Sequence, residues 1–214
     1  MRKGLRVVAP LLPAAFALGA SFGVLARASH FSAAAAVVMS ATTFGGSSQV
    51  AAASLLGAGG SIAAAVVAAL LLNLRYTPMG ITVAQSFHGL PVVQRLAEAQ
   101  LLVDESWALS GGGTRRFDRR MMLGIGAAMW FAWVGGTAVG ALLGGVVGDP
   151  SSFGLDGAFA ALFLALLVSQ LANRRTIAAG VLGAAVAAVL TPLSPPGVPI
   201  LAATAAVLVG WKRG

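Results

Sequence analysis

The amino-acid sequence predicts an all-α membrane protein with about seven transmembrane helices, and two observations carry this prediction. First, 58% of the 214 residues are hydrophobic and only 9% are charged, whereas an ordinary soluble domain is about 25% charged. Second, the apolar residues are collected into long uncharged runs, and the mean hydropathy is +0.89. The chain has no long linker rich in Pro, Ser or charge, which indicates a single domain over residues 1–214.

The first apolar run, residues 7–26, holds 20 residues without a charge, long enough to cross a hydrocarbon core about 30 Å thick. A signal peptide is the alternative for this run, because its start is basic and Ala26-Arg27-Ala28 resembles a cleavage site; such peptides usually have shorter apolar cores. The last two runs hold 15 and 14 residues and would need bilayer thinning or shelter inside the protein. The seven predicted spans are residues 7–26, 32–56, 61–86, 121–147, 153–171, 176–190 and 198–211.

Residues 87–120 separate the third and fourth predicted spans and are polar. Apolar residues recur at helical spacing from Val92 to Leu109, which predicts a polar amphipathic helix at the membrane surface.

Composition also excludes several classes of function. The chain has no cysteine, so it has neither a disulfide framework nor a cysteine metal site. The net charge of +8 comes from short basic clusters between apolar runs, which suit lipid headgroups and give no basic face for nucleic acid. We expect no cofactor and no metal, because His30 and His88 are the only histidines and neither lies in a ligand motif.

Basic residues also predict the orientation of the chain in the membrane. If all seven runs cross and the N-terminus is external, ten basic residues face the cytoplasm and three face outside. The positive-inside rule then favours an external N-terminus and a cytoplasmic C-terminus, although the basic start of the first span favours the reverse. A re-entrant pass would resolve this conflict. The ten residues are Arg27, Arg95, Arg115, Arg116, Arg119, Arg120, Arg174, Arg175, Lys212 and Arg213.

The second predicted span contains the motif FGGSSQ, residues 44–49. Paired glycines weaken a helix, and Ser47, Ser48 and Gln49 offer hydrogen-bonding groups where lipid offers none. Transporters use such broken helices to hold substrates and ions. The alternative is close helix packing through small residues, which is common in membranes.

The motif NLRY, residues 73–76, places Arg75 within or at the end of the third predicted span. A charged side chain inside an apolar segment needs a partner, water or the interface. Arg75 is therefore either an interfacial anchor or an internal guanidinium suited to bidentate capture of a carboxylate. In the second case, Asn73 and the FGGSSQ segment would supply further polar contacts to an amino acid.

Asp156 lies at the start of the fifth predicted span. Partial desolvation there would raise the pKa of its carboxyl group and suit it to proton coupling. A simpler interpretation is a helix N-terminal acid that the helix dipole favours.

Four glycines recur every four residues along the fourth predicted span and lie near one helical face. We expect them to let another helix approach closely. They are Gly136, Gly140, Gly144 and Gly148.

Six motifs, in order and at matching spacing over nearly the whole chain, resemble the AzlC family. Two departures are Tyr76, where family members often have His, and Ser47, where they often have Ala; a phenol with a pKa near 10 is poorly suited to relay protons. The motifs are Phe22-Gly23, FGGSSQ, NLRY, DESWAL, WFAWVGGTAVGALLG and GLDGAFAALF.

The resemblance implies the large subunit of a bacterial branched-chain amino acid exporter. Such a permease would lie in the plasma (inner) membrane, draw on the proton gradient, and work with a small AzlD-type subunit of about four helices. The resemblance does not fix the amino acid, because apolar pockets discriminate by only about 1–3 kcal/mol per methylene.

Two other classes of function compete with transport. An enzyme would need a nucleophile with its base or a metal set, and the chain shows neither; Asp104 and Glu105 are neighbours in a predicted helix and point about 100° apart. A structural or assembly subunit of a membrane complex is the remaining alternative. Transport of substrate by reconstituted protein distinguishes these classes.

Overall fold

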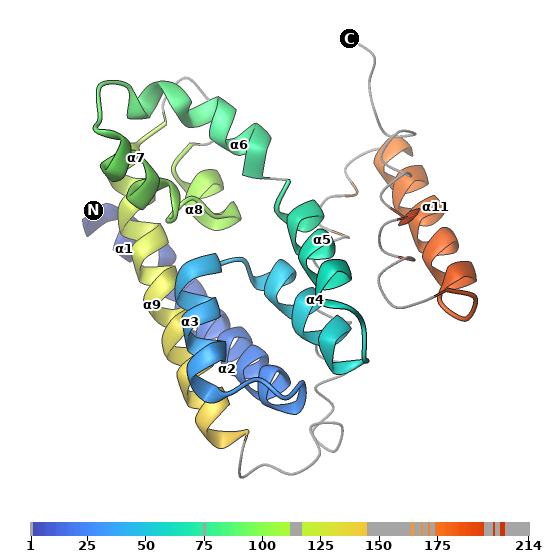
Figure 1. The fold of residues 1–214 in the computed structure, drawn as a ribbon. Coiled ribbons are helices and arrows are strands. Elements are labelled where there is room, and N and C mark those ends of the chain that lie inside the picture. Colours follow the sequence, from blue (N-terminus) through green and yellow to red (C-terminus); the bar gives the residue numbers. More distant parts are fainter. Residues whose placement is uncertain are drawn as a thin grey trace.

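The computed structural model describes residues 2–74, 76–111, 117–144 and 174–194, with single positions between 164 and 203 (Figure 1). Every regular element in these ranges is a helix. Three helical segments are long and apolar enough to cross a membrane: Lys3–Ala28, Ile62–Phe87 and Arg119–Leu143. The all-α membrane class is therefore confirmed for the described part. The predicted count of about seven spans is not confirmed: residues 32–56 are described below, and residues 153–163 and 204–211 lie outside the described part.

The first spanning segment consists of α1 (Arg2–Val8), η1 (Ala9–Leu11) and α2 (Leu12–Ala28). Pro10 and Pro13 fall at the starts of η1 and α2. Proline lacks the N–H group of a helical hydrogen bond and its ring clashes with the preceding turn. The short 3-10 turn between α1 and α2 is the local consequence, because it satisfies the backbone with tighter bonds.

Helix α9 (Arg119–Leu143) packs along this first segment, and the two run parallel. Gly4 lies beside Met121, Gly19 beside Trp133 and Gly23 beside Thr137, so residue numbers rise together along both helices. Their N-terminal ends therefore lie at the same end of the molecule, which we call the N-terminal end (Figure 1).

Glycines on both helices make this contact possible. A Cβ atom on Gly136 would lie 2.1 Å from Phe16 O, and one on Gly140 would lie 1.9 Å from Ala20 O. Gly19 and Gly23 are equally constrained from the α2 side, by Trp133 O at 2.3 Å and Thr137 O at 2.4 Å. The two backbones meet without intervening side chains, as small residues permit in membrane helix pairs.

Gly144 lies beside the side chain of Arg27, and a Cβ atom on Gly144 would lie 3.1 Å from Arg27 Cβ. Gly148, the fourth glycine of the predicted stripe, lies outside the described residues.

The predicted second span does not form one crossing helix. It divides into α3 (Ala33–Thr43) and α4 (Gly46–Gly57), whose 11 and 12 residues measure only about 16–18 Å each at 1.5 Å per residue. The Ser32 hydroxyl caps α3 just after Ser29, and Gly57 at the end of α4 lies against the same Ser29. The pair thus enters and leaves at one end. Residues 32–56 form a re-entrant hairpin, and the expected crossing is corrected.

The next spanning segment, Ile62–Phe87, contains α5 (Ile62–Asn73), α6 (Tyr76–Val83) and η2 (Ala84–Phe87). The Ser61 side chain accepts from Ala64 N at 3.2 Å and caps α5 at its start. Asn73 lies beside Gly45 at the tip of the hairpin. The polar residue that ends α5 therefore meets the break between α3 and α4.

Two short helices replace the single amphipathic helix predicted over residues 92–109: α7 (Val92–Ala99) and α8 (Asp104–Leu109). The Ser106 hydroxyl accepts from Val103 N at 2.9 Å and can donate to the Leu101 carbonyl at 2.8 Å. These bonds satisfy the backbone groups of the turn and start a new helix, which helical periodicity alone does not reveal.

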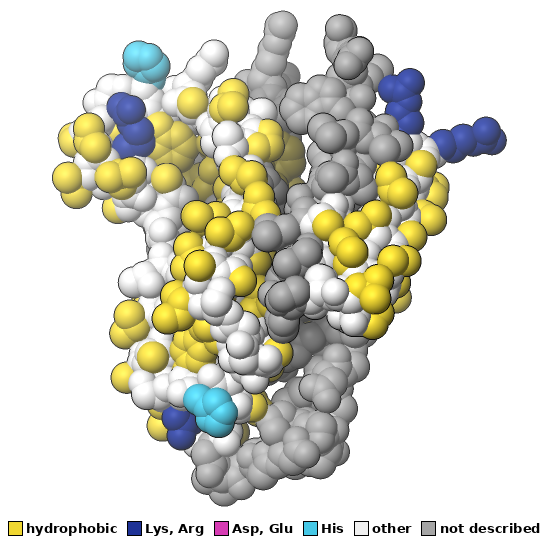
Figure 2. All heavy atoms as spheres, turned by 45° about the vertical axis from the view of Figure 1, so that its right-hand side comes forward, with side chains coloured by type: hydrophobic (Ala, Val, Ile, Leu, Met, Phe, Trp, Pro, Cys, Tyr) yellow, Lys and Arg dark blue, Asp and Glu magenta, His cyan; other side chains and the backbone are white. Residues whose placement is uncertain are grey.

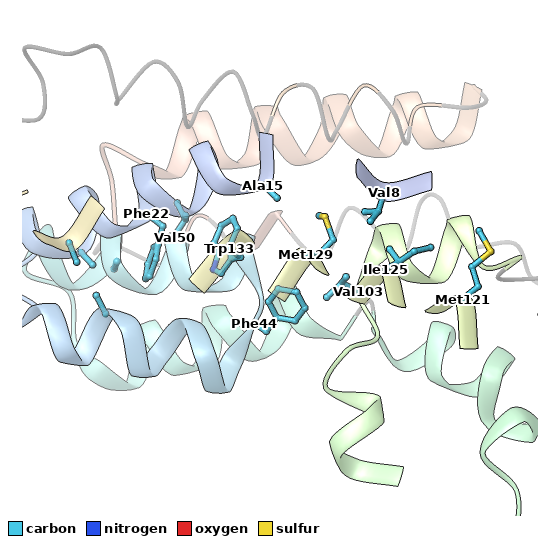
Figure 3. Packing of buried hydrophobic residues seen from close by; sticks show 14 residues of the cluster. Val8, Ala15, Phe22, Phe44, Val50, Val103, Met121, Ile125, Met129 and Trp133 are labelled. Carbon is cyan, nitrogen blue, oxygen red and sulfur yellow. The ribbon is translucent and has the colours of Figure 1, made fainter. Parts of the chain in front are cut away.

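Among the described residues, the largest hydrophobic core runs along α9, where α1, α2, α3 and α4 contribute buried side chains. Figure 3 shows Phe22 of α2, Val50 of α4 and Trp133 of α9 side by side. The Phe22 and Trp133 rings stack with centroids 6.3 Å apart. Helix α11 (Arg174–Leu190) covers the sixth predicted span and begins two residues before it.

Candidate functional site

The tip of the re-entrant hairpin is the break between α3 and α4, at Phe44 and Gly45. Phe44 has a φ of 42° and is 7% exposed. A bulky residue in the left-handed region is strained, and strain of this kind collects at functional sites. The contacts around Phe44 therefore hold its backbone in this conformation, and the break is a defined part of the fold.

The paired glycines at the break are required by close contacts. A Cβ atom on Gly46 would lie 2.9 Å from the Trp133 ring. One on Gly45 would lie 2.6 Å from Ser48 Oγ and 3.1 Å from Asn73 Oδ1. Larger residues would push α4 away from α9 or displace the Asn73 amide.

Three carbonyl groups near the end of α3, those of Ser40, Ala41 and Thr42, are already bonded to protein donors. Trp130 Nε1 donates to Ala41 O at 3.0 Å, and Gln100 Nε2 donates to Thr42 O at 2.6 Å. Phe44 N donates to Ser40 O at 3.2 Å. The negative end of the α3 dipole is thus neutralised from within the protein.

A buried hydrogen-bond network joins both halves of the hairpin to α9. Trp133 Nε1 donates to Gln49 Oε1 at 3.0 Å, and Gln49 Nε2 donates to Ser40 Oγ at 3.2 Å. Ser40 Oγ and Thr137 Oγ1 lie 2.8 Å apart. Gln49, Ser40 and Thr137 are fully buried, so this network fixes the position of the break against α9.

The serines and the glutamine of FGGSSQ differ in their surroundings. Ser48 Oγ donates to Gly45 O at 2.8 Å, and both polar atoms of the Gln49 side chain are bonded within the network. Ser47 Oγ is buried without a hydrogen-bond partner in the described structure, and so is Asn73 Oδ1. Unsatisfied buried polar groups are rare in proteins, and each one calls for a missing partner such as a water or another bound group. In the described residues Arg27 Nε and Ser110 Oγ are also unpartnered, but only Ser47 Oγ and Asn73 Oδ1 belong to the residues around the break.

The chemistry of the break favours a small zwitterion. The N–H groups in the first turn of a helix lack intrahelical partners and attract anions, and α4 presents that turn at the break. Ser47, in the same turn, can donate to a carboxylate, and Asn73 Oδ1 can accept from an ammonium group. The two ends of an amino acid backbone match these two kinds of group.

Arg75 and Asp156 lie outside the described residues. Arg75 follows Asn73 by two residues in the sequence, and Tyr76 begins α6. Within the described ranges, no group of three or more potential metal ligands comes together.

Sequence reasoning misses the contribution of α9 to this site. In the sequence, Trp133 and Thr137 lie in the apolar run 121–147, where no charged residue or polar cluster sets them apart. The available signal is their spacing: residues 133 and 137 are one turn apart on the helix that carries Gly136 and Gly140.

The fold and the break define a polytopic membrane protein with a discontinuous, re-entrant helix pair. Residues 10–147 match the family described as AzlC protein, and the chain belongs to that family. The match includes α2, so the first span is part of the family domain. The chain is also similar to a protein of Archaeoglobus fulgidus described as an uncharacterized membrane protein, with 34% identity over 147 residues. The similar region covers 66% of this chain and 64% of that relative. No solved structure matches the chain significantly.

Proposed function

We propose that the chain is the large subunit of an amino acid permease and that the substrate binds at the break between α3 and α4. The observation that carries this proposal is the pair of buried, unpartnered polar atoms, Ser47 Oγ and Asn73 Oδ1, beside the first turn of α4. Discontinuous helices hold substrates in this way in secondary transporters.

Each residue predicted to bind substrate takes a distinct role in this proposal. Ser47, Asn73 and Arg75 contact the amino acid, with Arg75 on its carboxylate. Ser48 and Gln49, whose side chains bond to protein groups, position the break and do not contact substrate. The rings of Phe44 and Trp133 adjoin the break and suit an apolar side chain, in keeping with a branched-chain substrate.

Three further parts of the proposal come from the resemblance to exporters: a small AzlD-type subunit, export as the direction of transport, and proton coupling through Asp156. Counterflow of a panel of amino acids, measured in vesicles that hold the chain with and without the small subunit, tests them. We expect uptake of branched-chain amino acids only with both proteins. Absence of counterflow for every amino acid would instead favour a structural or assembly subunit.

Replacing Asp156 by Asn is expected to abolish the proton dependence of transport and to keep substrate exchange.

We also propose that the N-terminus is cytoplasmic, the reverse of the orientation expected from seven crossings. Because residues 32–56 re-enter, the N-terminal end and the described polar residues 88–111 and 117–118 fall on the same side of the membrane. The exposed basic residues Lys3, Arg6, Arg95 and Arg120 gather there, whereas Arg27 lies at the opposite end. The positive-inside rule then places the N-terminal end in the cytoplasm.

The absence of cysteine makes this orientation directly testable. Ala58 and His88 are exposed at opposite ends of the Ile62–Phe87 segment. We expect a membrane-impermeant maleimide to label Ala58→Cys in intact cells and His88→Cys only after lysis. The opposite labelling pattern would restore the external N-terminus.

A further inference from the structure

Helix α7 is amphipathic, with its apolar and polar residues on opposite sides. At 100° per residue, Val92, Val93 and Leu96 lie on one face and Gln94, Arg95 and Glu98 on the other. In a water-soluble protein the apolar face of such a helix would pack on the core.

In this protein the polar face of α7 connects the helix to the rest of the chain. The Arg119 guanidinium, at the start of α9, binds both carboxylate oxygens of Glu98. Gln94 Nε2 donates to Glu98 Oε1 at 2.9 Å. The hydrogen bond from Arg119 lowers the pKa of the Glu98 carboxyl group, so the pair is charged at neutral pH. The residue after α7, Gln100, bonds to the tip of the hairpin.

The apolar face of α7 is uncovered. Val92, Val93 and Leu96 are 66%, 79% and 66% exposed, and no residue of α7 is buried. A helix of 8 residues is too short to be stable in water without packing. No described residue covers this face, so the contact that stabilises α7 lies beyond the described part of the chain.

The position of α7 beside the ends of the spanning segments indicates what contacts its apolar face. Arg119 begins the spanning helix α9, and its guanidinium lies 5.9 Å from the centre of the Phe87 ring, which ends the segment Ile62–Phe87. Helix α7 is thus attached at the end of the molecule where two candidate spanning segments, Ile62–Phe87 and Arg119–Leu143, meet (Figure 1). At the upper end in Figure 2, hydrophobic side chains surround a basic side chain.

We propose that α7 lies in the membrane interface at the N-terminal end, with Val92, Val93 and Leu96 among the lipid acyl chains. Arg95 and Arg120, both exposed, contact the headgroups of anionic phospholipids. Apolar residues on one side and basic residues at the rim are the features of an interfacial helix on an anionic lipid surface. This inference depends neither on the substrate nor on which side of the membrane the N-terminus occupies.

Single cysteines carrying an environment-sensitive fluorophore test the depth of α7. The full chain, labelled at Val93→Cys or at the control position Gln94→Cys, is reconstituted in vesicles of phosphatidylcholine and phosphatidylglycerol. We expect spin-labelled lipid to quench the label at residue 93 and aqueous iodide to quench the label at residue 94 preferentially. The proposal would be overturned if iodide quenched the label at residue 93 as well as spin-labelled lipid does. It would also be overturned if a co-reconstituted small subunit protected that label from both quenchers.

A second measurement tests the headgroup contact. The quencher is carried either on phosphatidylglycerol or on phosphatidylcholine, and quenching at residue 93 is compared between the two. We expect phosphatidylglycerol to be preferred by about five-fold for each basic residue near the surface. The variant Arg95→Gln/Arg120→Gln, checked for native elution, is expected to lose most of that preference. If the preference survives in this variant, or if both lipids quench the parent equally, Arg95 and Arg120 do not contact anionic headgroups.

Discussion

Replacing Gly136 by alanine is expected to disrupt the protein, while the same change at the neighbouring Gly135 is expected to be tolerated. The added methyl group at residue 136 would lie 2.1 Å from a backbone oxygen of α2, which cannot move without shifting the whole helix. At residue 135 the nearest atom is a side-chain carbon of Phe16 at 3.8 Å, an ordinary contact. Overpacking of a tight core typically costs about 1–3 kcal/mol, and contact with rigid backbone places Gly136→Ala at or above that range.

The measurement is the thermal midpoint of aggregation for the two purified variants in the same detergent. The thermal midpoint of Gly135→Ala should equal that of the parent or be slightly higher, because alanine is a better helix former than glycine by up to about 1 kcal/mol. Equal midpoints for both variants would contradict the parallel packing of α2 on α9.

Replacing Gln49 by leucine is the second change with a large expected effect. Gln49 is fully buried and bonds to both Trp133 and Ser40. Leucine would leave the Trp133 N–H group without an acceptor, and an unsatisfied buried donor costs about 1–3 kcal/mol. The hairpin tip would also lose its link to α9, so substrate affinity should fall together with stability.

A double-mutant cycle separates this bond from general packing. Trp133→Phe removes the donor and keeps an aromatic ring, and leaves Gln49 Oε1 unpaired. In the combined variant neither partner remains unsatisfied, so its loss in the free energy of unfolding should be smaller than the sum of the two single losses. Strictly additive losses would show that the two side chains do not interact.

The break in the hairpin could be predicted from local sequence, but its path through the membrane could not. Two adjacent glycines followed by Ser47, Ser48 and Gln49 indicate a weak helix wherever they occur. Whether the chain then continues across the membrane or turns back depends on contacts with residues far away in sequence, such as Gly57 with Ser29 and Gly46 with Trp133. Hydropathy measures the length of the apolar run and not its direction, which is why it predicts a crossing for residues 32–56.

The glycine stripe shows the same limit. Spacing of four residues indicates a close contact on one face of α9, yet nothing in it identifies α2 as the neighbour or the parallel direction. At the candidate site, Ser47, Ser48 and Gln49 are equivalent in the sequence as polar residues in an apolar run. The structure separates them, because the partner of Gln49 is Trp133, 84 residues further along the chain.

The central claim, that an amino acid binds at the break between α3 and α4, is tested most directly by substrate affinity in the purified protein, measured together with the proposed small subunit. Ser47→Ala has a matched control in Ser54→Ala, an exposed serine on the same helix. Arg75→Gln removes the charge, and Arg75→Lys keeps the charge but loses the paired planar hydrogen bonds.

Loss of a hydrogen bond to a charged group costs about 1.5–3 kcal/mol, or roughly 10- to 150-fold in the dissociation constant. We predict losses of this size for Ser47→Ala and for both Arg75 variants, with Ser54→Ala binding as the parent does. If all four variants bind the amino acid with the affinity of the parent, the substrate does not bind at the break.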